Sequence, residues 1–137
     1  MKVYLAAQYP RRDEMRYVAK LFLEHNIEVT SRWLYETDSL NSQLPDNPPY
    51  SHRECATTDI ADIKAADTLV LFSENPLIGV PRGGRHTEFG FALGSGKRVV
   101  VIGGAENNFH YLPEVVHYSD VDSFLEAEGI SNEPVAD

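Results

Sequence analysis

The chain has 137 residues, one cysteine and a formal net charge of −9, and 42% of its residues are hydrophobic. This length and composition are typical of a globular domain with its own core, so we expect one domain over 1–137. The negative charge argues against nucleic acid as a partner, because contacts to a phosphate backbone need clustered Lys and Arg. No apolar run reaches the ~18 residues of a membrane span, and the first residues do not resemble a signal peptide. The lone Cys55 excludes an internal disulfide framework and favours the reducing cytoplasm.

The first third of the chain alternates apolar strands with an amphipathic helix. Residues 2–7 are apolar and predict a buried strand, and residues 27–34 are rich in β-branched and aromatic side chains, which predicts a second strand. Between them, residues 11–26 predict a helix that Asn26 ends. One stripe of this helix carries the side chains expected to face the core: Met15, Val18, Phe22 and His25, with Leu21 beside them. Residues 35–50 contain three prolines and predict a long loop, which in a compact domain is often functional.

A second helix and a buried strand follow. Residues 51–67 predict a helix that opens with a capping box of Ser51 and Glu54. The side chains expected to be buried from it are Ala56, Ile60 and Ile63. Residues 68–73 are continuously apolar, as in a strand that is covered on both faces.

The rest of the chain repeats this alternation. A short helix is expected from about Arg85 or His86 to Gly94, and strands are expected over 98–104 and 115–119. Residues 120–129 predict a last helix, and 130–137 a frayed tail. The side chains of the last helix expected to point inward are Val121, Phe124 and Leu125.

This pattern predicts an α/β fold: a three-layer, doubly wound, five-stranded parallel sheet of flavodoxin or Rossmann type, with strand order 2-1-3-4-5. Such sheets bind ligands beyond the carboxyl ends of their strands. In this chain the segments expected there are 8–12, 33–50, 74–85 and 103–109.

Glu88 is the candidate for chemistry at this edge. We expect it in the first turn of its helix, where free N–H groups and the helix dipole favour the ionised carboxylate. A carboxylate of this kind suits a glycosyl-transfer nucleophile, because it attacks the anomeric carbon or stabilises the positive charge that grows there. Gly83 and Gly84 just before it allow the backbone to approach a ligand closely. The same position also fits an acid that only satisfies the helix dipole.

Three stretches of the sequence resemble the nucleoside 2-deoxyribosyltransferase family, which includes the 2'-deoxynucleoside 5'-monophosphate N-glycosidases. They are KVYLAAQYP, DIADIKAADTLVLF and GGRHTEFGFALGSGKRVVVIG, and the resemblance covers most of the chain, roughly Lys2 to Gly104. It implies that Glu88 is the nucleophile and that Asp59 acts on the substrate to help the leaving base. It also implies that the hydroxyl of Tyr4 contacts the glutamate. From the residues alone, Asp59 also fits an ordinary surface acid and Tyr4 a packed core side chain.

The resemblance implies a double displacement with retention at C1'. Glu88 attacks C1' as the base departs, and the glycosyl-enzyme then meets water or another base. No cofactor or metal is expected, since the histidines show no ligand spacing. The resemblance also implies a small nucleoside or nucleotide as substrate. Relatives form dimers or larger assemblies, so a homodimer or higher homo-oligomer is expected.

Further side chains at the same edge are candidates for substrate binding. Gln8 and Tyr9 are expected near the sugar, and Trp33, with Tyr35 and Tyr50, either stacks on the base or packs the loop onto the domain. The polar candidates are Arg11, Arg12, Arg85 and His86, together with Gly83 and Gly84. Arginines gathered at one edge of an acidic chain suggest an anionic substrate such as a nucleotide 5'-phosphate, or are simply exposed to solvent. His86 either donates to substrate or caps its helix.

The chain also departs from the family's patterns. The loop before Glu88 lacks the further acid of the base-exchanging transferases, and the segment after residue 7 lacks the glycine-rich loop of the monophosphate hydrolases. Two other functions therefore stay open. PRGGRHTE loosely resembles an element of nucleotide phosphoribohydrolases, which would change the sugar to ribose. Alternatively, the same pocket binds a nucleotide without catalysis and acts as a sensing module.

Overall fold

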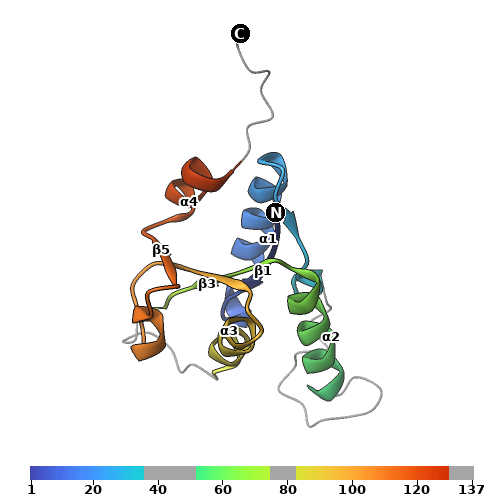
Figure 1. Ribbon diagram of the computed structural model, residues 1–137. Coiled ribbons are helices and arrows are strands. Elements are labelled where there is room, and N and C mark those ends of the chain that lie inside the picture. The colour runs from blue at the N-terminus through green and yellow to red at the C-terminus, as the bar shows by residue number, and fades with distance from the viewer. Residues whose placement is uncertain (36–51, 75–82, 130–137) are drawn as a thin grey trace.

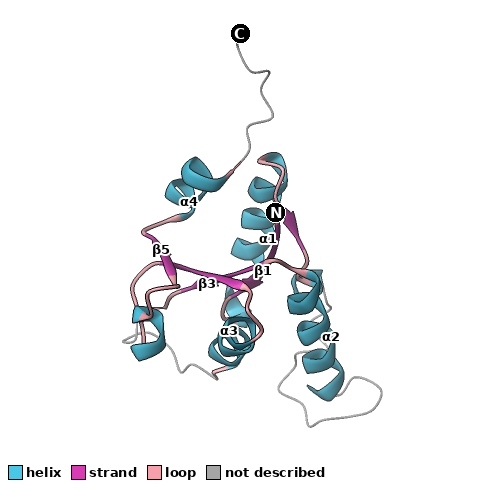
Figure 2. Cartoon of the chain, viewed as in Figure 1, coloured by secondary structure: helices cyan, strands magenta, loops and turns pink. Residues whose placement is uncertain are grey.

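The computed structural model describes residues 1–35, 52–74 and 83–129. Five parallel strands form one sheet in the order β2-β1-β3-β4-β5, which confirms the predicted α/β fold and strand order. The strands are β1 (Lys2–Ala6), β2 (Glu28–Val29), β3 (Thr68–Phe72), β4 (Arg98–Ile102) and β5 (Val116–Tyr118). In the register of the three central strands, Tyr4 pairs with Leu69, and Leu69 pairs with Val99. Figure 2 shows the strands in magenta between the helices.

Helices cover both faces of the sheet. They are α1 (Arg12–Glu24), α2 (His52–Ala65), α3 (Gly84–Gly94) and α4 (Val121–Glu128), with short 3-10 helices η1 (Tyr9–Arg11), η2 (Arg32–Tyr35) and η4 (Asn108–Tyr111). In Figure 1, α1 and α4 lie on one side of the sheet and α2 and α3 on the other. The ring of Phe22 on α1 stacks on that of Phe124 on α4, with centroids 5.1 Å apart. None of the helices in the described residues is long and apolar enough to cross a bilayer.

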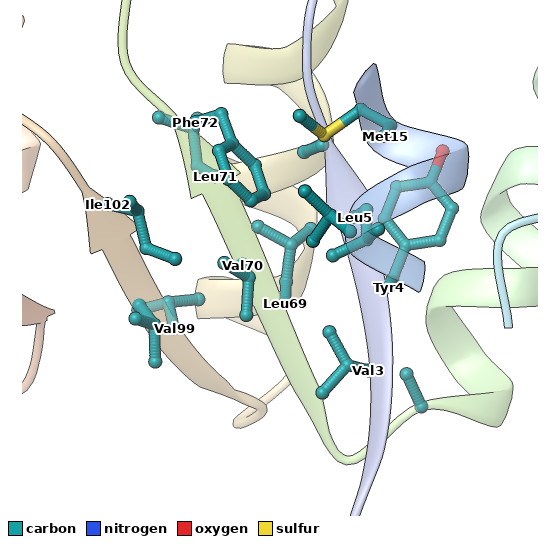
Figure 3. Close-up of a cluster of buried hydrophobic side chains, with 14 of the residues drawn as sticks. Val3, Tyr4, Leu5, Met15, Leu69, Val70, Leu71, Phe72, Val99 and Ile102 are labelled. Atoms are coloured by element: carbon teal, nitrogen blue, oxygen red, sulfur yellow. The ribbon is translucent and has the colours of Figure 1, made fainter. Parts of the chain in front are cut away.

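The core is built on the central strands. All five residues of β3 are buried, as are the last four of β1 and of β4, because helices cover both faces of these strands. Figure 3 shows part of this cluster, in which Tyr4 and Leu5 of β1 lie among side chains of β3, β4 and α1. Tyr4 is fully buried. The core therefore holds a phenol whose hydroxyl must find a hydrogen-bond partner inside the protein.

The predicted second strand is too long, because β2 ends at Val29 and not at residue 34. Side chains of the following residues then replace the backbone ladder. The hydroxyl of Ser31 accepts a hydrogen bond from the Leu5 N–H at 2.8 Å, and the indole N–H of Trp33 donates to the Leu5 carbonyl at 3.0 Å. These side chains satisfy the backbone N–H and carbonyl of Leu5. The chain after Val29 therefore does not need to continue as a strand, and it forms η2.

The predicted buried stripe of α2 is partly wrong. Ala56 is exposed, whereas Asp62 and Ile63 are buried. Asp62 accepts hydrogen bonds from the backbone N–H of Arg32 at 2.9 Å and from its Nε at 2.8 Å, and this polar anchor turns the Asp62 side of the helix inward. Asp59, one turn earlier on the same side, is consequently partly buried.

The other boundaries are close to prediction. The predicted strands over 98–104 and 115–119 are shorter in the structure, and α3 begins at Gly84 and ends at Gly94. Phe124 and Leu125 of α4 are buried, and Val121 packs against the core. The loop residues 36–50, the capping Ser51 and the tail lie outside the described residues.

Candidate active site

A hydrogen bond between Tyr4 and Glu88 is the centre of the candidate site. The hydroxyl of Tyr4, on β1, donates to Oε2 of Glu88, on α3. Burial chiefly, and then the negative charge of Glu88, raise the pKa of Tyr4 above its ordinary value. The phenol therefore stays protonated and acts as a donor to the carboxyl group.

The backbone before Glu88 corrects one expectation from the sequence. Gly83, with φ +84°, caps the helix in the left-handed region, and α3 begins directly after it. Glu88 is therefore the fifth helical residue, and the first turn of α3 holds no acid. The helix N-terminus is consequently not what sets its ionisation, because dipole effects are confined to the first turn.

Burial governs the protonation of Glu88 instead. Removal of the carboxylate from water raises the pKa of Glu88 from 4.5 to about 8, against the hydrogen bond from Tyr4, which lowers it. The nearby charge of Asp59 raises it further. The expected ionised carboxylate is thus replaced, at neutral pH, by a group that is mainly protonated.

Asp59 adds a second carboxyl group to the site. It lies on α2, is partly buried, and its charge acts on both Glu88 and Tyr4. A strand and two helices that are distant in sequence therefore gather one phenol and two carboxyl groups. The chemistry that this trio allows is a nucleophile or charge stabiliser, a donor that holds it, and a second acid for proton transfer.

The segment after β1 contributes polar and aromatic groups. The side-chain amide nitrogen of Gln8 is buried and has no hydrogen-bond acceptor among residues 1–35, 52–74 and 83–129. The guanidinium of Arg12 lies 4.9 Å from the ring centroid of Tyr9 and donates to its hydroxyl at 2.7 Å. The ring of Tyr9 in turn lies 6.5 Å from that of Trp33.

The sequence left two roles open for Trp33, base stacking and packing onto the domain, and in the structure Trp33 is packed. Only 7% of the residue is exposed, and its N–H is used by the carbonyl of Leu5. Tyr35, in contrast, is 68% exposed at the end of η2, and Tyr50 lies outside the described residues.

Two of the predicted phosphate-binding arginines are paired with carboxylates. Arg11 donates to Glu14 at 2.5 Å and to Glu74 at 2.9 Å. Arg85 donates to both oxygens of Glu106, one of them at 2.7 Å, and its side chain is only 3% exposed. Glu74 and Glu106 were not predicted as partners of these arginines, although both lie in segments predicted to follow strands at the ligand-binding edge.

His86 belongs to a cluster with the segment after β4. The side-chain oxygen Oδ1 of Asn107 accepts from the backbone N–H of Phe109 at 3.0 Å. The side-chain nitrogen Nδ2 of Asn107 therefore faces Nδ1 of His86, at 3.4 Å. Nδ1 therefore accepts, and the ring proton lies on Nε2, 4.0 Å from Glu106. Burial first, and then the charge of Arg85, lower the pKa of His86, which favours the neutral ring. No group of three or more His, Cys, Asp or Glu side chains in the described part of the chain forms a metal-binding cluster.

Comparisons with known proteins give the fold a context. No protein-family model and no curated protein matches the chain. Among solved structures, a CMP N-glycosidase from Clostridium botulinum aligns with a TM-score of 0.54 and 23% identity, over 93% of this chain and 97% of its own. A 2-deoxyribosyltransferase from Bacillus psychrosaccharolyticus aligns with a TM-score of 0.61 and 19% identity, over 98% of this chain and 93% of its own.

A third solved structure, a conserved protein from Enterococcus faecalis, aligns with a TM-score of 0.51 and 19% identity, over 98% of this chain and 91% of its own. The first two proteins carry the names of activities found in the family that the sequence resembles. The resemblance is thereby confirmed at the level of the fold.

Proposed function

We propose that this protein cleaves the N-glycosidic bond of 2'-deoxynucleosides or their 5'-monophosphates through a glycosyl-enzyme on Glu88, and passes the sugar to water or to another base. The observation that carries the proposal is the hydrogen bond from the buried Tyr4 hydroxyl to the Glu88 carboxyl group, beside Asp59. The similarity to an N-glycosidase and a 2-deoxyribosyltransferase supports it.

In the first step, an oxygen of the ionised Glu88 forms a bond to C1' while the bond from C1' to the base nitrogen breaks. The electron pair of that bond leaves with the base, and Asp59, protonated or acting through a water molecule, supplies a proton to the base. Tyr4 keeps the attacking oxygen in line. Positive charge that develops on the sugar favours the ionised form of the partly buried Glu88, so the desolvation of this carboxylate is offset most in the transition state.

In the second step, water or the nitrogen of an acceptor base attacks C1' and the bond to Glu88 breaks, which regenerates the carboxylate. Asp59 takes up the proton that the attacking group loses. Two displacements at C1' give overall retention of configuration. Gln8, with its buried amide nitrogen next to β1, is proposed to bind the sugar.

The test is a chromatographic assay of base release. Deoxynucleosides, ribonucleosides and their 5'-monophosphates are incubated with the protein, with and without a second free base, and with Glu88→Gln in parallel. Release or exchange of base by the natural protein, lost in the variant, supports the proposal. Binding without turnover in both proteins would instead support a nucleotide-sensing module, and cleavage of ribonucleotides alone would support a phosphoribohydrolase.

The resemblance also leads us to propose a homodimer or higher homo-oligomer, and the lone Cys55 leads us to propose that it works in the reducing cytoplasm. Light scattering coupled to size exclusion measures the mass of the particle. A monomer across micromolar concentrations would contradict the assembly.

A further inference from the structure

We propose that this site takes uncharged 2'-deoxynucleosides in preference to their 5'-monophosphates, and that Glu74 and Glu106 set this preference. The inference rests on the function proposed above for the same site. Its basis is the pairing of Arg11 and Arg85, two arginines at the carboxyl edge of the sheet, with carboxylates of the chain itself.

Each nitrogen of Arg11, which directly precedes α1, already donates to another group of the chain. Its Nε donates to Glu14 at 2.9 Å, and its Nη2 donates to the same carboxylate at 2.5 Å. Its Nη1 donates to Glu74 at 2.9 Å and to the carbonyl of Ser73 at 3.2 Å. Two carboxylates and a carbonyl thus surround one positive charge, and the local balance is negative.

Arg85, the second residue of α3, is less accessible to a phosphate than Arg11. Both of its terminal nitrogens donate to Glu106, in the bidentate geometry that a phosphate would otherwise use. Its side chain is 3% exposed and that of Glu106 14% exposed. To bind a phosphate, this pair would have to separate and leave the mostly buried side chain of Glu106 as an unpaired charge, which is costly.

The remaining polar groups do not reverse the balance. His86, beside Glu106, favours the neutral ring, and Arg12 lies over the ring of Tyr9. Among the described residues at this edge, the arginines Arg11, Arg12 and Arg85 are matched in number by the carboxylates Glu14, Glu74 and Glu106. Asp59 adds to the negative side, as does the fraction of Glu88 that is ionised. A phosphate dianion entering this edge meets net repulsion, whereas a nucleoside carries no charge to be repelled.

The first test compares the natural protein's use of matched ligand pairs. The four common 2'-deoxynucleosides and their 5'-monophosphates are compared by kcat/KM for base release and by calorimetric Kd. We expect the nucleoside of the preferred base to be favoured by about tenfold or more in both measures. Equal or better binding or turnover of the monophosphates overturns the inference, as does the absence of binding by any nucleoside.

These outcomes also separate the two proposals. If nucleosides bind more tightly than monophosphates but no base is released, the proposed catalysis fails and the ligand preference stands. If monophosphates are cleaved faster than nucleosides, the catalysis stands and the preference fails.

The second test removes one charge. Glu74→Gln removes one negative charge beside Arg11, although the amide oxygen can still accept from the guanidinium, and we expect the ratio of nucleoside to monophosphate kcat/KM to fall by about fivefold. Glu128→Gln is the matched control, because Glu128 pairs with Arg98 at the first residue of β4, on the opposite edge of the sheet. It makes the same change in net charge and is expected to change the ratio by less than about twofold. An equal effect of the two variants, or none from Glu74→Gln, contradicts the role given to Glu74.

Discussion

The hydroxyl of Tyr4 donates a hydrogen bond to the carboxyl group of Glu88, 84 residues further along the chain. This contact joins the strand β1 to the helix α3 and holds the partly buried carboxyl group of Glu88 against the fully buried ring of Tyr4. Burial raises the pKa of both groups, whereas the hydrogen bond by itself lowers the pKa of Glu88.

Glu88→Gln is expected to reduce kcat for base release by at least about a thousandfold, because an amide cannot form the glycosyl ester. The amide keeps an oxygen that accepts from the Tyr4 hydroxyl, so the fold should be retained. Base release is measured by chromatography and folding by circular dichroism. Turnover within about tenfold of the natural protein would remove Glu88 from the mechanism.

Tyr4→Phe is expected to lower kcat by about tenfold to a hundredfold with little change in KM, because a hydrogen bond to a charged group is lost while the ring still fills the core. The hydrogen bond lowers the pKa of Glu88, so its loss also moves the ionisation of Glu88 to higher pH. Tyr118→Phe, on β5, is the control and should change kcat by less than about twofold. A Tyr4 variant that retains full activity and an unchanged pH profile would contradict the positioning role.

The pH dependence of kcat/KM should rise toward alkaline pH. The pKa of Glu88 is about 8, so at pH 7 only about a tenth of the free protein carries the nucleophilic carboxylate. Activity should therefore grow roughly tenfold per pH unit below pH 7 and level off above about pH 9. Asp59→Asn should shift the midpoint to lower pH, because the charge of Asp59 raises the pKa of Glu88. A profile that is flat between pH 6 and pH 9 would contradict this ionisation.

The same shift predicts a pH-dependent stability difference between the natural protein and Glu88→Gln. Folding raises the pKa of Glu88 from 4.5 to about 8, so between these values the folded state binds a proton that the unfolded state does not. The contribution of Glu88 to the free energy of unfolding is therefore present below pH 4.5 and is lost as pH rises through 8. The variant should match the natural protein at pH 4.5 and exceed its stability by roughly 5 kcal/mol at pH 9, measured by urea unfolding. A difference that does not change with pH would contradict the burial of this group.

Gly83→Ala is expected to lower the free energy of unfolding by about 1 kcal/mol or more, because Gly83 has φ +84° and an alanine is strained there. A Cβ at this position meets nothing within 4 Å, so the cost is conformational and not steric. Gly84→Ala is the matched control, since Gly84 also has open space but begins the helix without a positive φ. It should be neutral or slightly stabilising. Equal effects of the two substitutions in urea unfolding would show that the left-handed cap does not matter.

Local pattern in the sequence was sufficient for the layered fold. The continuous apolar runs of β3 and β4 identify strands that are covered on both faces, and the helical stripe of α1 identifies its buried side. These signals depend only on the spacing of neighbouring residues, so they can be read without the partner elements. The identities of Tyr4, Asp59 and Glu88 were also available from the sequence, through its resemblance to a known family.

Contacts between distant residues decided the rest. Side chains of Ser31 and Trp33 end β2 early by bonding Leu5, and Asp62 turns α2 inward through Arg32. The sequence by itself determined which helices and strands form, because the spacing of apolar residues along the chain is a local property. Only the tertiary structure decided that Glu88 is partly buried with a raised pKa, and that Arg11 and Arg85 face carboxylates, because desolvation and charge pairing depend on neighbours brought together by folding.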